Sequence, residues 1–187
     1  MVAGLVLAAG AGTRFGGRKQ LAELDGRPLL EHALAAMAGA PVEPVAVVLG
    51  FEAAEIRAGV DMQGAEAIVC PDWIEGQAAS LRTGIEALER AGAEAVVVTL
   101  GDQPGIAAQA IAAVVAARGD GASAVRATYD GVPGHPVLLE QSLFGAVCSL
   151  RGDVGARELL SGAVVTDVPC DGLGEPGDVD TPADLER

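Results

Sequence analysis

The sequence alternates between short apolar runs and segments with helical spacing, and this alternation allows few architectures. Four nearly continuous apolar runs have the character of strands buried on both faces: Gly4–Ala8, Val45–Leu49, Glu66–Cys70 and Ala95–Leu100. Strands that alternate with helices are typical of a parallel sheet with crossover helices. We therefore expect one α/β domain over residues 1–187, with helices on both faces of a twisted, mostly parallel sheet.

The segments between and after these runs predict the remaining elements. Amphipathic helices are expected from Pro28 to Gly39, around Ala78–Leu88 and over Ile106–Ala117. Further along, Ala124–Thr128 and Val137–Leu139 favour antiparallel additions to the sheet, and the turn-rich stretch Asp130–Pro136 between them favours a loop. Two more helices are expected near Glu140–Cys148 and Gly155–Leu160.

A glycine-rich segment, Gly10–Lys19, follows the first apolar run and ends in the only lysine of the chain. Glycines let backbone N–H groups approach an anion closely, and an ammonium is a compact point charge on a flexible stem. The segment therefore indicates phosphate binding. An ordinary turn beside a solvated lysine would give the same spacing.

Two common phosphate loops do not match this segment. The third glycine position of the dinucleotide fingerprint is Phe15, and about ten residues pass before a helical pattern begins. In a Walker loop the lysine precedes serine or threonine, whereas Lys19 precedes Gln20. The sequence therefore favours neither a Rossmann dinucleotide turn nor a Walker loop.

Three loops are expected at one edge of the sheet, because ligands of open α/β sheets bind beyond the carboxyl ends of the strands. Gly10–Lys19 follows the first predicted strand, Pro71–Trp73 the third and Gly101–Pro104 the fourth. Together they can line one crevice. Each could also be a simple turn, with Asp102 as a helix cap.

Composition excludes several classes of function. Acidic residues outnumber basic ones by 26 to 12, a net charge of −14, and aromatic residues make up 3%. Such a chain repels polyanions and offers few stacking surfaces, so we expect no nucleic-acid partner. Cys70, Cys148 and Cys170 are widely spaced, which favours a reducing, cytoplasmic location. No signal peptide or membrane span is expected.

Six motifs, in order, resemble those of the molybdenum-cofactor nucleotidyltransferases, and more closely those of the cytidylyltransferase branch. They are Leu7–Gly10 with Arg14, Gly16, Gly17 and Lys19; Pro71–Trp73 with Gly76, Ser80–Arg82 and Gly84; Gly101–Pro104; Gly134–Leu138; Gly152–Asp153 with Gly155–Arg157; and Asp178–Pro182 with Asp184–Leu185. Ala9 and the Gly134-His135-Pro136 segment are similar to the cytidylyl branch. Phe15 departs from the family, where methionine is common.

The resemblance implies a Rossmann-like nucleotide-diphospho-sugar transferase fold and transfer of CMP from CTP to the terminal phosphate of molybdopterin, with magnesium as cofactor and release of pyrophosphate. By family match, Arg14, Lys19 and Asp102 are catalytic and also contact the nucleotide; Leu7, Ala8, Ala9, Gly10, Gly12, Asp72 and Ser80 bind the nucleotide; Asp102 and Asp180 bind magnesium; and His135 and Arg157 bind the acceptor. A phosphate monoester is already ionised near neutral pH, so such a reaction needs alignment and charge neutralisation more than a general base. Transient contact with a molybdenum enzyme is also implied.

Other interpretations stay open at this point. A related nucleotidyltransferase could use GTP or another phosphorylated acceptor, since fold says little about the acceptor. Some relatives are described as NAD(P)H-dependent reductases, and a non-catalytic protein could deliver the cofactor to a molybdenum enzyme. Ser80 could serve only as a helix-start residue, His135 and His32 could be structural, and Trp73 is expected to be a packing anchor.

Overall fold

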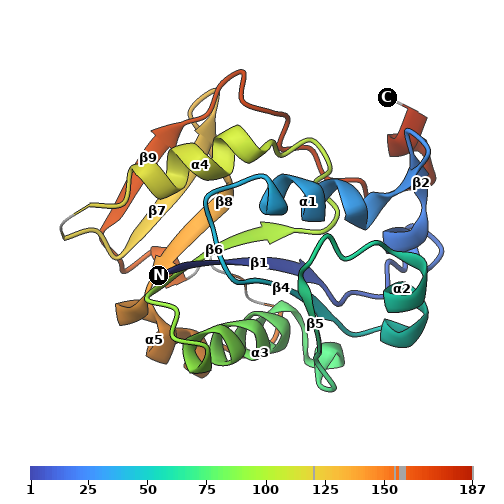
Figure 1. Cartoon of the computed structure of the whole chain (residues 1–187), viewed down its shortest axis with the longest axis horizontal. Coiled ribbons are helices and arrows are strands. Elements are labelled where there is room, and N and C mark those ends of the chain that lie inside the picture. The colour runs from blue at the N-terminus through green and yellow to red at the C-terminus, as the bar shows by residue number, and fades with distance from the viewer. Residues whose placement is uncertain (120, 154, 156–158, 187) are drawn as a thin grey trace.

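The computed structural model describes residues 1–119, 121–153, 155 and 159–186, which form a seven-stranded sheet flanked by helices (Figure 1). The strands are β1 (Val2–Ala8), β4 (Val45–Leu49), β5 (Glu66–Val69), β6 (Ala95–Leu100), β7 (Ala124–Tyr129), β8 (Val132–Glu140) and β9 (Val165–Pro169). Their order across the sheet is β5-β4-β1-β6-β8-β7-β9. Strand β8 pairs antiparallel with both neighbours, and the other pairs are parallel. The expected mixed, mostly parallel sheet is confirmed.

The helices cover both faces of this sheet. They are α1 (Leu29–Ala38), α2 (Ala53–Gly59), α3 (Gln77–Arg90), α4 (Ala108–Ala116) and α5 (Phe144–Ser149). Short 3-10 helices are η1 (Lys19–Leu21), η2 (Trp73–Glu75), η3 (Gln141–Leu143) and η4 (Pro182–Glu186), and a small hairpin joins β2 (Glu23–Leu24) to β3 (Arg27–Pro28). Figure 1 shows α1 and α4 on one face and α3 and α5 on the other.

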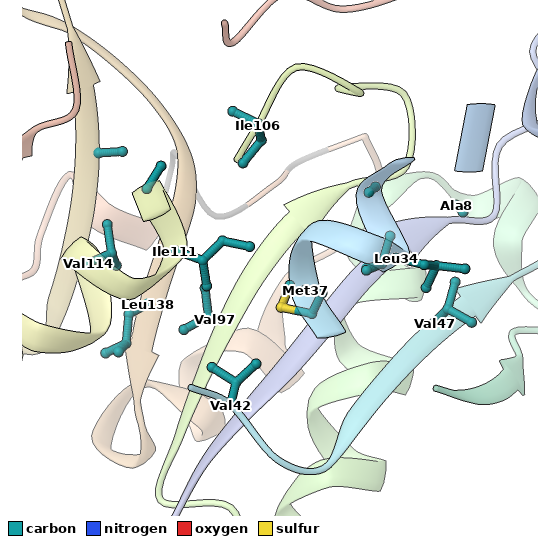
Figure 2. Close-up of a cluster of buried hydrophobic side chains, with 14 of the residues drawn as sticks. Ala8, Leu34, Met37, Val42, Val47, Val97, Ile106, Ile111, Val114 and Leu138 are labelled. Atoms are coloured by element: carbon teal, nitrogen blue, oxygen red, sulfur yellow. The ribbon is translucent and has the colours of Figure 1, made fainter. Parts of the chain in front are cut away.

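Two hydrophobic clusters, one on each face, hold the layers together. On the first face, side chains of α1 and α4, such as Met37 and Ile111, point toward strand residues such as Val97 (Figure 2). On the second face, α3 packs on β1 so closely that a Cβ on Gly84 would lie 2.5 Å from Cδ1 of Leu5. Because both faces of the central strands are buried, those strands have no polar alternation.

Several predicted elements need correction. Only Asp130 and Gly131 form the turn after β7, and the rest of the expected loop up to Pro136 belongs to β8. The residues 134–136 fall where the β7–β8 register shifts, so their turn-like composition marks an irregular strand segment instead of a loop. Helix α5 begins at Phe144, after η3, and the expected helix Gly155–Leu160 falls partly outside the described residues. In the described part of the chain, no helix is both long and apolar enough to cross a bilayer.

Candidate active site

A cavity of ≈ 640 Å³ opens at the carboxyl ends of β1 and β6, the edge at which ligands bind in open α/β sheets. Its lining comes from the glycine-rich segment, the start of α3, the end of β6 and two acidic residues further along: Leu7–Arg14, Lys19, Gln20, Trp73, Ile74, Gly76, Gln77, Ser80, Leu100–Asp102, Asp153 and Asp180. The expected crevice is therefore present, and it collects most of the predicted site residues. Asp72 does not line it and is exposed to solvent.

Gln20 fixes the glycine-rich loop to the end of β1. Its side chain is buried, and Nε2 donates hydrogen bonds to the backbone oxygens of Ala8 (2.8 Å) and Gly10 (2.9 Å). The loop then turns at Gly12, whose φ of +60° and close approach to Lys19 Cβ (3.0 Å from a built Cβ) require glycine. Sequence reasoning used Gln20 only to exclude a Walker loop and missed this role.

Four charged side chains meet on the floor of the cavity. Lys19 Nζ lies 2.7 Å from Asp102 Oδ2 and 3.6 Å from Asp180 Oδ1, and Arg14 Nη1 lies 2.9 Å from Asp180 Oδ2. The Lys19 side chain is 13% exposed, whereas that of Arg14 is 75% exposed. The cluster is therefore neutral overall, with a largely buried lysine side chain at its centre and a solvated guanidinium at its edge.

The backbone brings the two carboxylates together from distant parts of the chain. Val179 N–H donates to the backbone oxygen of Asp102 (2.9 Å), which ties the residue before Asp180 to the end of β6. The side chain of Asp184 accepts from the backbone N–H groups of Asp180 (3.1 Å) and Thr181 (2.8 Å). Asp180 is thus held by hydrogen bonds on both sides.

The donor set of the cluster fits a hard divalent cation that is shared with a substrate. Two carboxylates already converge on one positive charge, that of Lys19. Among the residues that the structure describes, no group of three or more His, Cys, Asp or Glu side chains is placed to hold a metal. Mg²⁺ is commonly bound through one or two carboxylates, several waters and substrate phosphates, so two protein ligands suffice.

The opposite wall of the cavity is formed by η2 and the first turn of α3. Trp73 packs edge-on against Phe51, with ring centroids 5.7 Å apart, and so acts as the packing anchor expected from the sequence while it also lines the cavity. Ser80 is buried in this wall, and Ile74 is 79% exposed at the rim. This wall therefore places the apolar side chains of Trp73 and Ile74 beside the charged floor, a surface that suits a flat ring.

A second cavity of ≈ 370 Å³ adjoins the first, with Leu100 lining both. Its other lining residues are Gln103, Arg126, Tyr129, Val132–His135, Val137, Leu160, Pro176 and Asp178. His135 lies here, on β8 and not in a loop, while Arg157 lies outside the described residues. Gln103 and Asp178 belong to recognised motifs but were not singled out as site residues from the sequence.

Two titratable groups of the second cavity are perturbed. Burial raises the pKa of Tyr129 to about 12, and its hydroxyl donates to the backbone oxygen of His135 (3.0 Å). Partial desolvation raises the pKa of Asp178, and the nearby carboxylates of Asp102 and Asp180 raise it further. The carboxylates of the first cavity therefore influence Asp178, which lines the second.

Known proteins share this architecture over nearly the whole chain. "Nicotine blue oxidoreductase" of Paenarthrobacter nicotinovorans is 32% identical over 196 residues, covering 100% of this chain and 95% of the relative. The crystal structure of a homologue of Mycobacterium tuberculosis Rv0371c, from Mycobacterium sp. strain JC1, has a TM-score of 0.84 at 36% identity, covering 100% of this chain and 93% of that one.

The structure of Rv0371c from M. tuberculosis H37Rv in complex with manganese has a TM-score of 0.83 at 30% identity and covers 100% of this chain and 96% of that one. Residues 4–168 match the family model described as "MobA-like NTP transferase domain". With the glycine loop, the paired carboxylates and the matching fold all in place, the chain belongs to the MobA-like NTP transferase family of nucleotidyltransferases.

Proposed function

We propose that the protein transfers CMP from CTP to the terminal phosphate of molybdopterin and releases pyrophosphate. The observation that carries the proposal is the cluster of Lys19, Arg14, Asp102 and Asp180 on the floor of a cavity bounded by the glycine loop. Such a cluster offers two cations to phosphates and two carboxylates to a metal. The cytidylyl-type motifs, with Ala9 and Gly134-His135-Pro136, support CTP and molybdopterin as substrates.

The glycine loop has the space to hold the triphosphate tail. A Cβ built on Gly10 would meet nothing within 4 Å, so the backbone here faces open space. Backbone N–H groups of the loop would bind the β- and γ-phosphates. Arg14, with its exposed guanidinium, would turn from Asp180 to the departing pyrophosphate, which it can bind in a bidentate manner.

Lys19 is placed to neutralise charge that grows at the α-phosphate during transfer. Its side chain is 13% exposed and its ammonium lies 2.7 Å from Asp102 Oδ2, so the side chain is already directed into the cavity before substrate arrives. Once a phosphate has replaced Asp102 on the ammonium, a charge fixed at this position stabilises a transition state in which negative charge grows at the α-phosphate. The acceptor phosphate is ionised near neutral pH, so the attack needs alignment and no general base from the protein.

Asp102 and Asp180 would hold Mg²⁺, which when bound supplies Lewis-acid neutralisation of the triphosphate charge. The manganese complex of Rv0371c supports the use of a divalent ion in this family. A net charge of −14 opposes the binding of a polyphosphate, and such an ion reduces this repulsion.

The acceptor would enter through the second cavity, which shares Leu100 with the first and contains His135. We assign His135, together with Arg157, to acceptor contact. Free thiols at Cys70, Cys148 and Cys170 support action in the reducing cytoplasm, with the product passed on by transient contact to a molybdenum enzyme.

The test is exchange of labelled pyrophosphate into CTP, GTP and ATP with magnesium and molybdopterin present. We expect exchange into CTP above the other two nucleotides. Because one relative is named an oxidoreductase, oxidation of NADPH is followed in parallel. NADPH consumption without turnover of any triphosphate would replace the transferase proposal with a reductase, and exchange into GTP alone would reassign the nucleotide.

A further inference from the structure

Among the described residues that line the second cavity, Asp178 is the one that carries a carboxylate, and most of the others are apolar. Leu100, Tyr129, Pro133 and Leu160 are among its lining residues. The cavity also contains Arg126, but its guanidinium forms two hydrogen bonds to the carboxylate of Asp167, at 2.9 and 3.2 Å. The positive charge of Arg126 is therefore already neutralised by Asp167. Asp178 is the charged group that is placed to accept hydrogen bonds from a ligand.

Gln103 holds this carboxylate in place. The Gln103 side chain is only 6% exposed, and Nε2 donates to Asp178 Oδ1 (2.7 Å) and to the backbone oxygen of Pro176 (3.3 Å). Asp178 itself is exposed at the cavity wall. A buried amide thus orients an accessible carboxylate, and since a carboxylate accepts about four hydrogen bonds, the one from Gln103 leaves capacity for a ligand.

This arrangement retains an unfavourable feature. Among the described protein atoms, Oε1 of Gln103 is buried without a hydrogen-bond partner. Buried polar atoms in folded proteins are nearly always paired, and an unpaired one is unfavourable. An apolar side chain of the same size would avoid this penalty, so the amide is explained by its donor end, which bonds the Asp178 carboxylate at 2.7 Å and the Pro176 backbone oxygen at 3.3 Å.

The position of Asp178 defines which part of an acceptor it meets. It lies two residues before Asp180, at the boundary between the charged floor and the second cavity. An acceptor whose phosphate reaches the first cavity extends its remaining part into the second. Apolar walls suit a flat ring there, and a carboxylate suits a ring edge with adjacent N–H donors, such as the 2-amino group and ring N–H of a pterin.

We propose that Asp178 recognises the heterocycle of the acceptor through its N–H donors, and that Gln103 is the positioning residue that orients Asp178 for this contact. The inference rests on the proposed function, because it takes the acceptor to carry both a phosphate and a ring with such donors. It adds a specificity-determining residue to the acceptor site.

The first experiment measures binding of two probes by fluorescence, without any triphosphate. 6-Hydroxymethylpterin carries the 2-amino donor, and 6-hydroxymethyllumazine has an oxygen in its place. We expect the wild-type protein to bind the pterin at least about tenfold more tightly, because hydrogen bonds to a charged group are strong. Asp178→Asn should abolish this preference, whereas the control Glu175→Gln, an exposed carboxylate in the same segment, should preserve it.

The second experiment tests the positioning role of Gln103. Gln103→Met should raise the KM for the acceptor about fivefold to tenfold and leave the KM for CTP unchanged. In an Asp178→Asn background the same substitution should have no further effect on the acceptor, because Gln103 acts through Asp178. Additive effects, or equal effects on both substrates, would show that Gln103 has only a structural role.

The outcomes separate this inference from the function on which it rests. Pterin binding that depends on Asp178, without exchange of pyrophosphate into CTP, would retain the inference and overturn the proposed reaction. Exchange into CTP with pterin binding unchanged in Asp178→Asn would overturn the inference alone. Absence of pterin binding to the wild-type protein would also overturn it.

Discussion

Asp102→Asn should strengthen the binding of CTP in the absence of metal and weaken it in the presence of magnesium. Lys19 is paired with Asp102 and Asp180, and Arg14 is paired with Asp180. A triphosphate without metal must displace these carboxylates and then remain close to them. Removal of the Asp102 charge should therefore raise the affinity for metal-free CTP. It should lower the affinity for CTP with magnesium, because the metal loses one of its protein ligands.

The size of the expected gain in affinity for metal-free CTP follows from Coulomb's law. A phosphate oxygen that replaced the Asp102 carboxylate on Lys19 would lie about 6 Å from the displaced charge, where two unit charges repel by about 3 kcal/mol at an effective dielectric constant of about 20. The Asp102 side chain is 29% exposed, so solvent screening reduces this to about 1.5 kcal/mol. That difference corresponds to about tenfold tighter binding of metal-free CTP.

Isothermal titration calorimetry with CTP, once with EDTA and once with magnesium, measures both effects. The matched control is Asp25→Asn, which removes the same charge from an exposed turn whose φ of +52° suits asparagine. The substitution at Asp102 keeps the backbone oxygen that binds Val179, so the fold at this point is retained. If metal-free affinity stays the same or falls in Asp102→Asn, the ion pairs do not compete with the nucleotide and the reasoning is wrong.

Three further substitutions test the packing and hydrogen bonding of the fold. Gln20→Leu should lower the free energy of unfolding by about 1–3 kcal/mol, because two backbone oxygens of the glycine loop lose their donor; an unchanged urea midpoint would contradict this. Gly84→Ala should destabilise by about 1–3 kcal/mol despite the better helix propensity of alanine, because its Cβ would lie 2.5 Å from Leu5 Cδ1 in a packed core; a higher melting temperature would show that the core can adjust. Tyr129→Phe should cost about 1 kcal/mol at neutral pH through the lost hydrogen bond to the His135 carbonyl. Burial raises the pKa of Tyr129 from 10.0 to about 12, so the stability contributed by its neutral hydroxyl is complete below pH 10 and is lost as the pH rises toward 12. The difference in urea stability between wild type and Tyr129→Phe should therefore narrow over that interval, and a constant difference would refute the linkage.

The central strands were predictable because burial on both faces leaves an unbroken apolar run in the sequence. Helix α2 was not predictable, because Ile56 is its one buried residue and a single buried position gives no helical repeat in the sequence. Strand β9 was missed for a related reason: it is an edge strand with Asp167 exposed, and no continuous apolar run marks it. Peripheral elements contribute few buried residues to the core, and their sequences therefore show little hydrophobic periodicity.

The candidate site, like the fold, could be predicted only in part from the sequence. Lys19, Asp102 and Asp180 could be identified because charged residues beside glycines and strand ends are conspicuous, and family motifs contain them. The structure adds that they form one ion-pair cluster, which depends on Val179 bonding to the backbone of Asp102. A contact between residues nearly eighty positions apart leaves no signal in a single sequence.

Gln20 and Gln103 explain how this site can exchange its charges without losing its shape. The ion pairs of the cluster must break when phosphates and metal bind, so they cannot also be what holds the loops in place. That task falls to neutral hydrogen bonds: the amide of Gln20 bonds the glycine loop to the end of β1, the Val179 N–H bonds the Asp180 segment to the backbone of Asp102, and the amide of Gln103 orients Asp178 beside it. Neutral amides keep these hydrogen bonds whichever ions occupy the cavity, because they carry no charge for a ligand to compete for. The same neutrality makes them inconspicuous in the sequence, where charge attracts attention and an amide beside a lysine or an aspartate does not.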